Sequence, residues 1–305
     1  MNNGLPDPGT AMPIDELLDH EEVDWQRVRR AHYALHQHLI YEYPGPIHDL
    51  NQRLMILPPH QHGDQRLIDY RLGVSTARYE MTCQDDSFGN REIKLLVPQV
   101  ERVIDFEAWI LVERSTEAGT HYTSANWLTD ARLLEPSALT RPDAALRQAA
   151  QKLFARCPQG LPLAELINDW TYQALRYRHE VTDIHTTAAE ALALGEGVCQ
   201  DFAHVMLALC RLCGLPARYA SGHMLGEGGT HAWVEVILPV EESPEVALVI
   251  PFDPTHGRRA SLSYLTIAVG RDYYDVAPTS GTFRAGYRGQ LTTHKRVGLT
   301  TVEYY

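Results

Sequence analysis

The spacing of apolar residues changes from strand-like to helical near residue 135 of this chain of 305 residues. Between residues 32 and 134 the pattern is strand-like, and one run places apolar side chains at every second position: Ile104, Phe106, Ala108, Ile110 and Val112. Residues two apart lie on the same face of a strand, so the apolar side chains of this run form one face that can be buried in a core. After Pro136 the spacing becomes helical over residues 142–155 and 163–175. The pattern predicts an α+β protein that begins with an antiparallel, sandwich-like β-domain.

The second part of the chain combines helices with further strands. A helix is expected to begin at Cys199, because apolar residues recur at helical spacing from Phe202 to Leu209. Gly214 follows where a C-terminal cap belongs. Strand candidates come next, over residues 217–224, 231–238 and 246–252. We therefore expect a helix packed on an antiparallel sheet.

These patterns divide the chain into three segments. The first is an acidic N-terminal extension over residues 1–31, the second a β-domain over residues 32–135, and the third a core with C-terminal strands over residues 136–305. Within the extension, residues 1–13 contain several Pro and Gly, which predicts a loose tail. Residues 13–30 are expected to form an exposed acidic helix.

Charge and cysteine content exclude some classes of partner and indicate the cellular compartment. A formal charge of -12 repels nucleic acid phosphates and anionic membrane surfaces, so neither is an expected partner. Five cysteines at irregular spacings do not form a disulfide framework and indicate a reducing compartment. The first 30 residues lack the basic start and apolar run of a signal peptide, and no run of about 18 apolar residues occurs. We expect a cytoplasmic protein.

Cys199 is the strongest candidate for a catalytic residue. It follows Gly195-Glu-Gly-Val and opens a helix, where unpaired N–H groups and the positive end of the helix dipole stabilise a thiolate. Its own backbone N–H points out of the helix start and suits an oxyanion donor. The alternative is a buried, inert cysteine on the apolar face of the helix.

His231 and Asp253 lie on the two strands that follow. His231 alternates with Trp233 and Glu235 along one strand face, and Asp253 ends the next apolar run before Pro254. A carboxylate there can accept a ring N–H of His231, which fixes the imidazole and stabilises its protonated form. Taken singly, a strand histidine is more often structural, and an aspartate before proline is usually a turn residue.

Other candidates have simpler explanations. Cys210 and Cys213 form a C-x-x-C pair that suits core packing on a helix, and the His36/His38 and His60/His62 pairs lack a third ligand at a recognisable interval. We therefore expect no metal and no cofactor. Three further residues are weak candidates for lining a catalytic cleft: Gln200, Tyr219 and Trp233.

Four blocks in order carry a family resemblance: Gly195-Glu-Gly-Val-Cys-Gln-Asp-Phe-Ala-His, Gly214-Leu-Pro-Ala-Arg-Tyr-Ala-Ser-Gly, Thr230-His-Ala-Trp-Val-Glu-Val and Phe252-Asp-Pro-Thr-His-Gly. With them the chain resembles the bacterial transglutaminase-like superfamily over roughly residues 140–275. Residues 32–134 resemble the N-terminal domain that often precedes this core.

The resemblance implies a papain-like fold and a triad. Cys199 is then the nucleophile, His231 the general base and later acid, and Asp253 the group that orients His231. The implied chemistry is acyl transfer on a peptide or protein substrate through a thioester, with hydrolysis favoured over protein cross-linking. A non-catalytic peptide-binding scaffold of the same fold and a metal-dependent hydrolase built on the histidine pairs stay open as alternatives.

Overall fold

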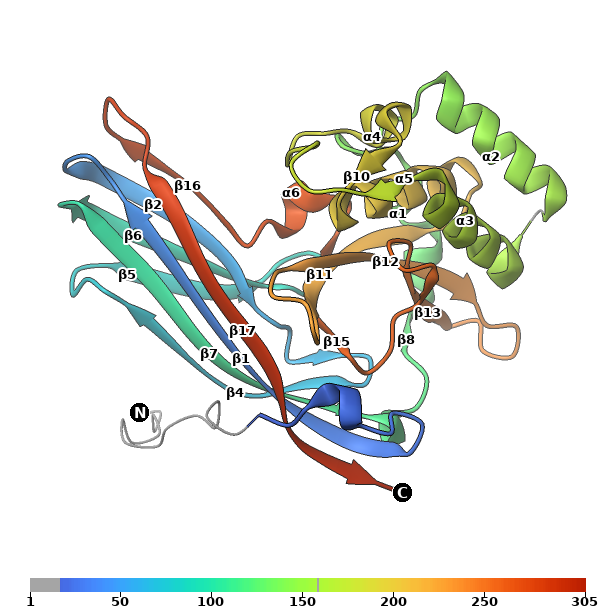
Figure 1. The fold of residues 1–305 in the computed structure, drawn as a ribbon, viewed down its shortest axis with the longest axis horizontal. Helices are drawn as coiled ribbons and strands as arrows, with labels where there is room; N and C mark the ends of the chain where they lie inside the picture. Colours follow the sequence, from blue (N-terminus) through green and yellow to red (C-terminus); the bar gives the residue numbers. More distant parts are fainter. Residues whose placement is uncertain (1–16, 158) are drawn as a thin grey trace.

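The computed structural model describes residues 17–157 and 159–305. Figure 1 shows two sheets of long strands on one side and a third sheet, covered by helices, on the other. The chain is α+β, with an N-terminal antiparallel β region followed by a helix-covered sheet, so the predicted fold class is confirmed. No helix within the described ranges is long and apolar enough to cross a membrane.

The β region is a sandwich of two antiparallel sheets, ordered β17-β1-β7-β4-β3 and β16-β2-β6-β5. Its inner faces bury apolar side chains such as Leu35, Phe106 and Ile110 between the sheets. The alternation read from residues 104–112 therefore marks a true core face. The first seven strands are β1 (Val28–Glu42), β2 (Ile47–Leu57), β3 (Gln61–His62), β4 (Gln65–Val74), β5 (Glu80–Asp85), β6 (Arg91–Val100) and β7 (Val103–Ser115).

The last two strands belong to this sandwich by pairing, which differs from the expected segment 136–305. β16 (Thr279–Arg284) pairs with β2, and β17 (Gln290–Tyr304) pairs with β1 along almost its whole length (Figure 1). Without β17 the long strand β1 would present an open edge of unpaired backbone groups. The chain thus leaves the sandwich after β7, builds the core and returns.

The N-terminal extension also differs from the prediction. Residues 17–27 contain only a three-residue 3-10 helix, His20–Glu22, and β1 begins at Val28. The N–H of Leu18 donates to the carbonyl of Leu299 on β17 at 2.8 Å, so this segment is held by pairing with a strand. A tertiary partner therefore overrides the local helical tendency. Residues 13–16 of the expected helix and the predicted tail lie outside the described residues.

The core is a sheet ordered β14-β13-β12-β11-β15, with β8 added beside β13. Helix α5 lies against β11 and β12 and is itself surrounded by α2, α3 and α4 (Figure 1). The helices are α1 (Ala131–Leu134), α2 (Ala144–Arg156), α3 (Gly160–Ala174), α4 (Ala188–Leu194), α5 (Cys199–Leu212) and α6 (Tyr273–Val276). The strands are β8 (Tyr122–Ser124), β9 (Arg176–Tyr177), β10 (Glu196–Gly197), β11 (Ala217–Met224), β12 (His231–Pro239), β13 (Val246–Asp253), β14 (Arg258–Arg259) and β15 (Tyr264–Gly270).

Side-chain amides of the sandwich dock on the core at the outer edge of β15. The Gln65 amide donates to the carbonyl of Thr266 at 2.7 Å and accepts from its N–H at 2.8 Å. Asn90 makes the same pair of bonds with Val269, at 2.7 Å each. These amides satisfy backbone groups that a neighbouring strand would otherwise pair, so they close a sheet edge.

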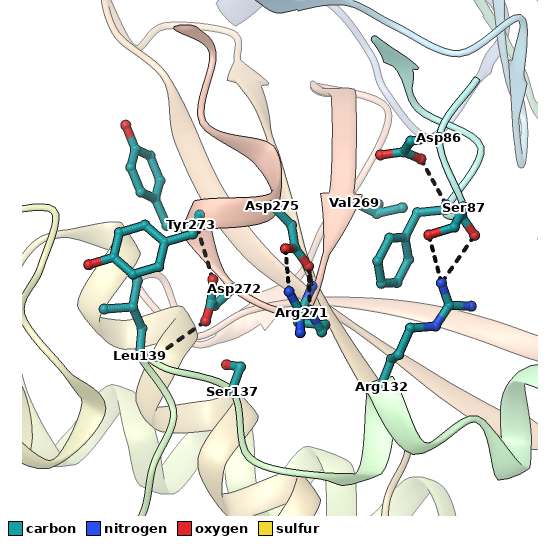
Figure 2. Close-up of polar contacts among 12 residues, drawn as sticks. Asp86, Ser87, Arg132, Ser137, Leu139, Val269, Arg271, Asp272, Tyr273 and Asp275 are labelled. Atoms are coloured by element: carbon teal, nitrogen blue, oxygen red, sulfur yellow. Dashed lines mark hydrogen bonds and ion pairs between the residues drawn. The ribbon is translucent and has the colours of Figure 1, made fainter. Parts of the chain in front are cut away.

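Further polar contacts join the segments around α6 (Figure 2). Arg132 on α1 donates to the Ser87 hydroxyl at 2.8 Å, which links the core helices to the β5–β6 hairpin. Asp272 accepts the N–H of Leu139 at 3.2 Å and that of Tyr274 at 2.9 Å, so it caps α6 and ties it to the chain before α2.

Candidate active site

The start of α5 is fixed by a buried carboxylate. Asp201 Oδ2 accepts the N–H of Val198 at 2.8 Å and the hydroxyl of Thr182 at 2.6 Å. A Cβ on Gly197 would lie 2.5 Å from that same oxygen, so the residue before Val198 has to be glycine. Because the first turn is held in this way, Cys199 occupies the first helical position in a defined orientation.

Cys199 is partly exposed and lies within hydrogen-bonding reach of the His231 side chain. Backbone N–H groups in the first turn of a helix have no partner within the helix, and they favour negative charge at this place. The thiol is thus accessible, near a base and at the positive end of a long helix. These three conditions are those of a reactive cysteine.

His231 is held from the opposite side by Asp253. The Nε2 atom of His231 lies 2.8 Å from Asp253 Oδ2, and both side chains are almost completely buried. The same carboxylate accepts the hydroxyl of Tyr264 at 2.6 Å and the N–H of Thr255 at 2.9 Å. Because Asp253 is bonded to Nε2, Nδ1 is the ring nitrogen that remains for a hydrogen bond with Cys199.

These contacts favour the charged forms of both groups. Burial alone would lower the pKa of His231, but its hydrogen bonds to Asp253, Cys199 and Glu227 raise it to about 12. Burial would raise the pKa of Asp253, yet the bonds from His231, His256 and Tyr264 hold it well below its usual range. Both shifts favour the imidazolium form of His231 and the carboxylate form of Asp253.

Two neighbours of this pair were not among the predicted site residues. Glu227 Oε2 lies 3.0 Å from His231 Nδ1, and His256 Nδ1 lies 2.8 Å from Asp253 Oδ2. The sequence contains one sign of these contacts, which is closeness along the chain: Glu227 precedes His231 by four residues, and His256 follows Asp253 by three.

A pocket of about 590 Å³ opens beside Glu227 and His256. Tyr177 is part of its wall and is about half exposed, since it lies on β9, after the end of α3. Tyr177 therefore belongs to the pocket wall and not to a helix. The lining residues are Tyr172, Leu175, Arg176, Tyr177, Phe202, Glu227, Thr255 and His256.

The three weak candidates for lining the cleft are largely buried. The Gln200 amide is directed to the Asp183 carbonyl at 3.4 Å, which ties α5 to the preceding loop. Trp233 is enclosed beside the rings of His231 and Tyr264. Tyr219 packs against His204 under α5. Trp233 and Tyr219 thus lie beneath the site, where they support it, and neither lines the pocket described above.

Two clusters in the described residues have three metal-ligand side chains close together. One is formed by His231, Asp253 and His256, whose atoms are engaged in the hydrogen bonds given above. The other is formed by His62, His121 and Glu235. In the second cluster Arg218 donates to Glu235 at 2.7 Å, and this cation opposes the binding of a second positive charge.

The C-x-x-C cysteines and two further histidines lie in structural surroundings away from the triad. Burial raises the pKa of both thiols of the C-x-x-C pair, that of Cys213 to about 11, as expected for core packing. His36 bonds Glu107 across the sheet at 2.8 Å. His223 is buried on β11 next to the Gly229 carbonyl, and burial lowers its pKa to about 3.

Comparison with known families matches both parts of the chain. The model of the transglutaminase-like superfamily matches residues 147–246, and that of the bacterial transglutaminase-like N-terminal region matches residues 33–113. The chain belongs to the transglutaminase-like superfamily. The resemblance carried by the four sequence blocks is thereby confirmed.

Related sequences and a solved structure match most of the chain. An uncharacterized protein of Mycobacterium tuberculosis is 29% identical over 254 residues, which are 74% of this chain and 79% of the relative. An uncharacterized protein of Mycobacterium leprae is 28% identical over 236 residues, 72% of this chain and 75% of that protein. The crystal structure of a Cytophaga hutchinsonii protein described as a putative cysteine protease superposes with a TM-score of 0.73 at 21% identity, covering 92% of this chain and 94% of the other. It shows the same fold over both parts of the transglutaminase-like chain.

Proposed function

We propose that this transglutaminase-like protein is a cysteine-dependent acyl-transfer enzyme that hydrolyses peptide or amide bonds. One observation carries the proposal: His231 is bonded through Nε2 to the buried carboxylate of Asp253 and reaches Cys199 with its other side. This order of thiol, imidazole and carboxylate is that of a catalytic triad, in which the third group orients and stabilises the imidazolium.

In the acylation step the Cys199 thiolate attacks the substrate carbonyl carbon, and the carbonyl oxygen takes the negative charge. The backbone N–H of Cys199, at the first position of α5, is the proposed donor to this oxyanion. The tetrahedral intermediate collapses when the C–N bond breaks and the proton on Nδ1 of His231 passes to the departing amine. A thioester between Cys199 and the acyl group is left.

In the second step water releases the acyl group. His231, now neutral, takes a proton from the water, whose oxygen attacks the thioester carbon, and the Cys199 thiolate departs as the carboxylic acid forms. Cross-linking would use a protein amine in place of water. We favour hydrolysis because water reaches a partly exposed thiol and the sequence shows no dedicated amine site. The expected substrate is a peptide or protein, and the odd cysteine count supports a reducing, cytoplasmic location.

Selective alkylation of the thiol tests the proposal. Iodoacetamide is added between about pH 4 and 9, and mass spectrometry locates the labelled cysteine. We expect Cys199 to react at lower pH and faster than the exposed Cys83, and this difference to disappear in His231→Ala. Equal labelling of Cys199 and Cys83 would favour a non-catalytic scaffold.

Turnover gives the matching functional test. Cys199→Ala should abolish hydrolysis of a peptide library with the fold unchanged, and His231→Ala should slow it by roughly 10²–10⁴-fold. Cys83→Ser is the control and should leave the rate unchanged. Activity that persists in Cys199→Ala, or that a chelator removes, would contradict the thiol mechanism. Incorporation of a labelled amine faster than hydrolysis would identify a cross-linking enzyme.

A further inference from the structure

The second ring nitrogen of His231 has two competing partners. Asp253 holds Nε2 at 2.8 Å, which leaves Nδ1 to face Cys199. Glu227 Oε2 lies 3.0 Å from this same Nδ1. An imidazolium carries one hydrogen on Nδ1, so a full hydrogen bond to the Glu227 carboxylate weakens the bond that the same hydrogen can make to the sulfur.

The two carboxylates on His231 differ in how firmly they are held. Asp253 is fully buried and accepts several other hydrogen bonds. Glu227 lies in the turn between β11 and β12, and its side chain is 33% exposed. A Cβ on Gly228 or Gly229 would meet nothing within 4 Å, so there is open space around the two residues that follow Glu227. Of the two, only Glu227 can leave His231 without unpacking the core.

The position of Glu227 also exposes it to an incoming substrate. It lines the pocket of about 590 Å³, together with Tyr177 and His256. The His256 Nε2 atom lies 3.7 Å from Glu227 Oε1, so a second polar partner for Glu227 is present on the pocket side. A group that enters this pocket meets the Glu227 carboxylate, which is bound to the same imidazole as Cys199.

We propose that Glu227 is a positioning residue that competes with Cys199 for the Nδ1 hydrogen of His231 and thereby restrains the nucleophile in the resting site. The inference rests on the proposed acyl-transfer function and adds a regulatory residue to it. When a substrate displaces the carboxylate, the Nδ1 hydrogen becomes available first to the thiolate and then to the leaving amine. The displacement itself exchanges only hydrogen bonds, and the covalent changes are those of the acylation step given above.

The charges around His231 and Glu227 determine in which direction the loss of Glu227 would change the reactivity of Cys199. Within residues 17–157 and 159–305, the titratable groups that face His231 or Glu227 are Cys199 of α5, Tyr177 of β9, Asp253 of β13, His256 of the following turn, and Tyr264 of β15. The hydrogen bond to His231 lowers the pKa of Glu227, which keeps it charged into the acidic range. Replacing Glu227 by a neutral residue removes a negative neighbour, which makes proton loss easier for both Cys199 and His231.

The test uses Glu227→Gln and the pH dependence of iodoacetamide alkylation at Cys199. We expect the step at which Cys199 becomes reactive to move to lower pH by about one unit, so that alkylation below the step is roughly tenfold faster. Glu227→Asp retains the charge and should move the step much less. Glu241→Gln removes a carboxylate in the exposed turn between β12 and β13 and should leave the profile unchanged.

The opposite result overturns the inference. If Glu227 only supported the fold or the ion pair of Cys199 with His231, Glu227→Gln would leave the pH at which Cys199 becomes reactive unchanged or raise it. Nitrogen-15 NMR of labelled histidine follows the same hydrogen without relying on reactivity, and His231 should become neutral at lower pH in Glu227→Gln than in the wild type. A wild-type Cys199 no more reactive than Cys83 would refute the acyl-transfer proposal, whereas an unchanged His231 titration would refute the role of Glu227.

Discussion

At the residue scale, the site depends on how Asp253 and His231 keep each other charged. Asp253 has no exposure to solvent, yet donors from His231, His256 and Tyr264 surround one of its oxygens. Each bond stabilises the carboxylate, and the carboxylate in turn stabilises the imidazolium. A buried charge pair of this kind costs stability when one partner is removed, because the other is then left uncompensated.

The pH dependence of stability should reveal this pair. In the folded state the pKa of His231 is raised to about 12, so its contribution is complete below the unfolded value of about 6.5 and is lost as pH rises toward 12. The pKa of Asp253 is lowered, so its contribution is present above about 3.9 and is lost as pH falls. We therefore expect His231→Gln to lower the free energy of unfolding more at about pH 5 than at about pH 9.

Urea denaturation at the two pH values measures this difference. His294→Gln on β17 is the control, since His294 is exposed and lies outside the site. Its effect should be small and equal at both pH values. A loss of stability in His231→Gln that is the same at about pH 5 and 9, or larger at about pH 9, would mean that His231 is neutral in the folded protein.

At the scale of the element, α5 delivers Cys199 because its first turn is anchored. Asp201 accepts from Val198 and Thr182 through one oxygen, and Gly197 allows the chain to pass against this side chain. Burial raises the pKa of Asp201, so its charge is not the source of the stabilisation. The two hydrogen bonds that Asp201 accepts provide the stabilisation, as in other N-terminal caps.

Two substitutions of Asp201 separate these contributions. Asp201→Ala removes both bonds and should cost about 1 kcal/mol of stability and reduce the labelling rate of Cys199. Asp201→Asn retains an oxygen that can accept both bonds without a buried charge, so it should cost clearly less. Thermal unfolding and iodoacetamide labelling measure the two effects. Equal losses in both variants would show that the charge itself holds the helix start.

At the scale of the whole molecule, the sandwich and the core form one structure because the chain crosses between them twice. β16 and β17 return to the sandwich after the core is complete, and β15 carries Leu265 and Ile267 into the core of the sandwich. The outer edge of β15 is then closed by the amides of Gln65 and Asn90. The position of the sandwich is therefore set by backbone pairing as well as by apolar contact.

Removing one of these amides should loosen the contact. Gln65→Met preserves length but leaves the N–H and carbonyl of Thr266 without their partner, at a cost of about 1–3 kcal/mol for a buried unsatisfied group. Gln99→Met, at an exposed position of β6, should change stability by less than about 0.5 kcal/mol. Urea midpoints compare the two, and equal midpoints would mean that water replaces the lost amide.

The sequence determined the local structure and the order of the candidate triad. Apolar periodicity marked the strand faces of residues 104–112 and the helices now seen as α2, α3 and α5. It also placed Cys199 at a helix start and Asp253 at a strand end, because caps and prolines act on the nearest residues of the chain.

Tertiary structure alone decided which elements meet. Periodicity shows which face of a strand is buried but not its partner, because the backbone groups that pair two strands are the same in every residue. The pairing of β17 with β1 was therefore not predictable, and neither was the edge of β15 closed by Gln65. The contact of Glu227 with His231 depends on the path of a glycine-rich turn, which local sequence leaves free and only the packed fold determines.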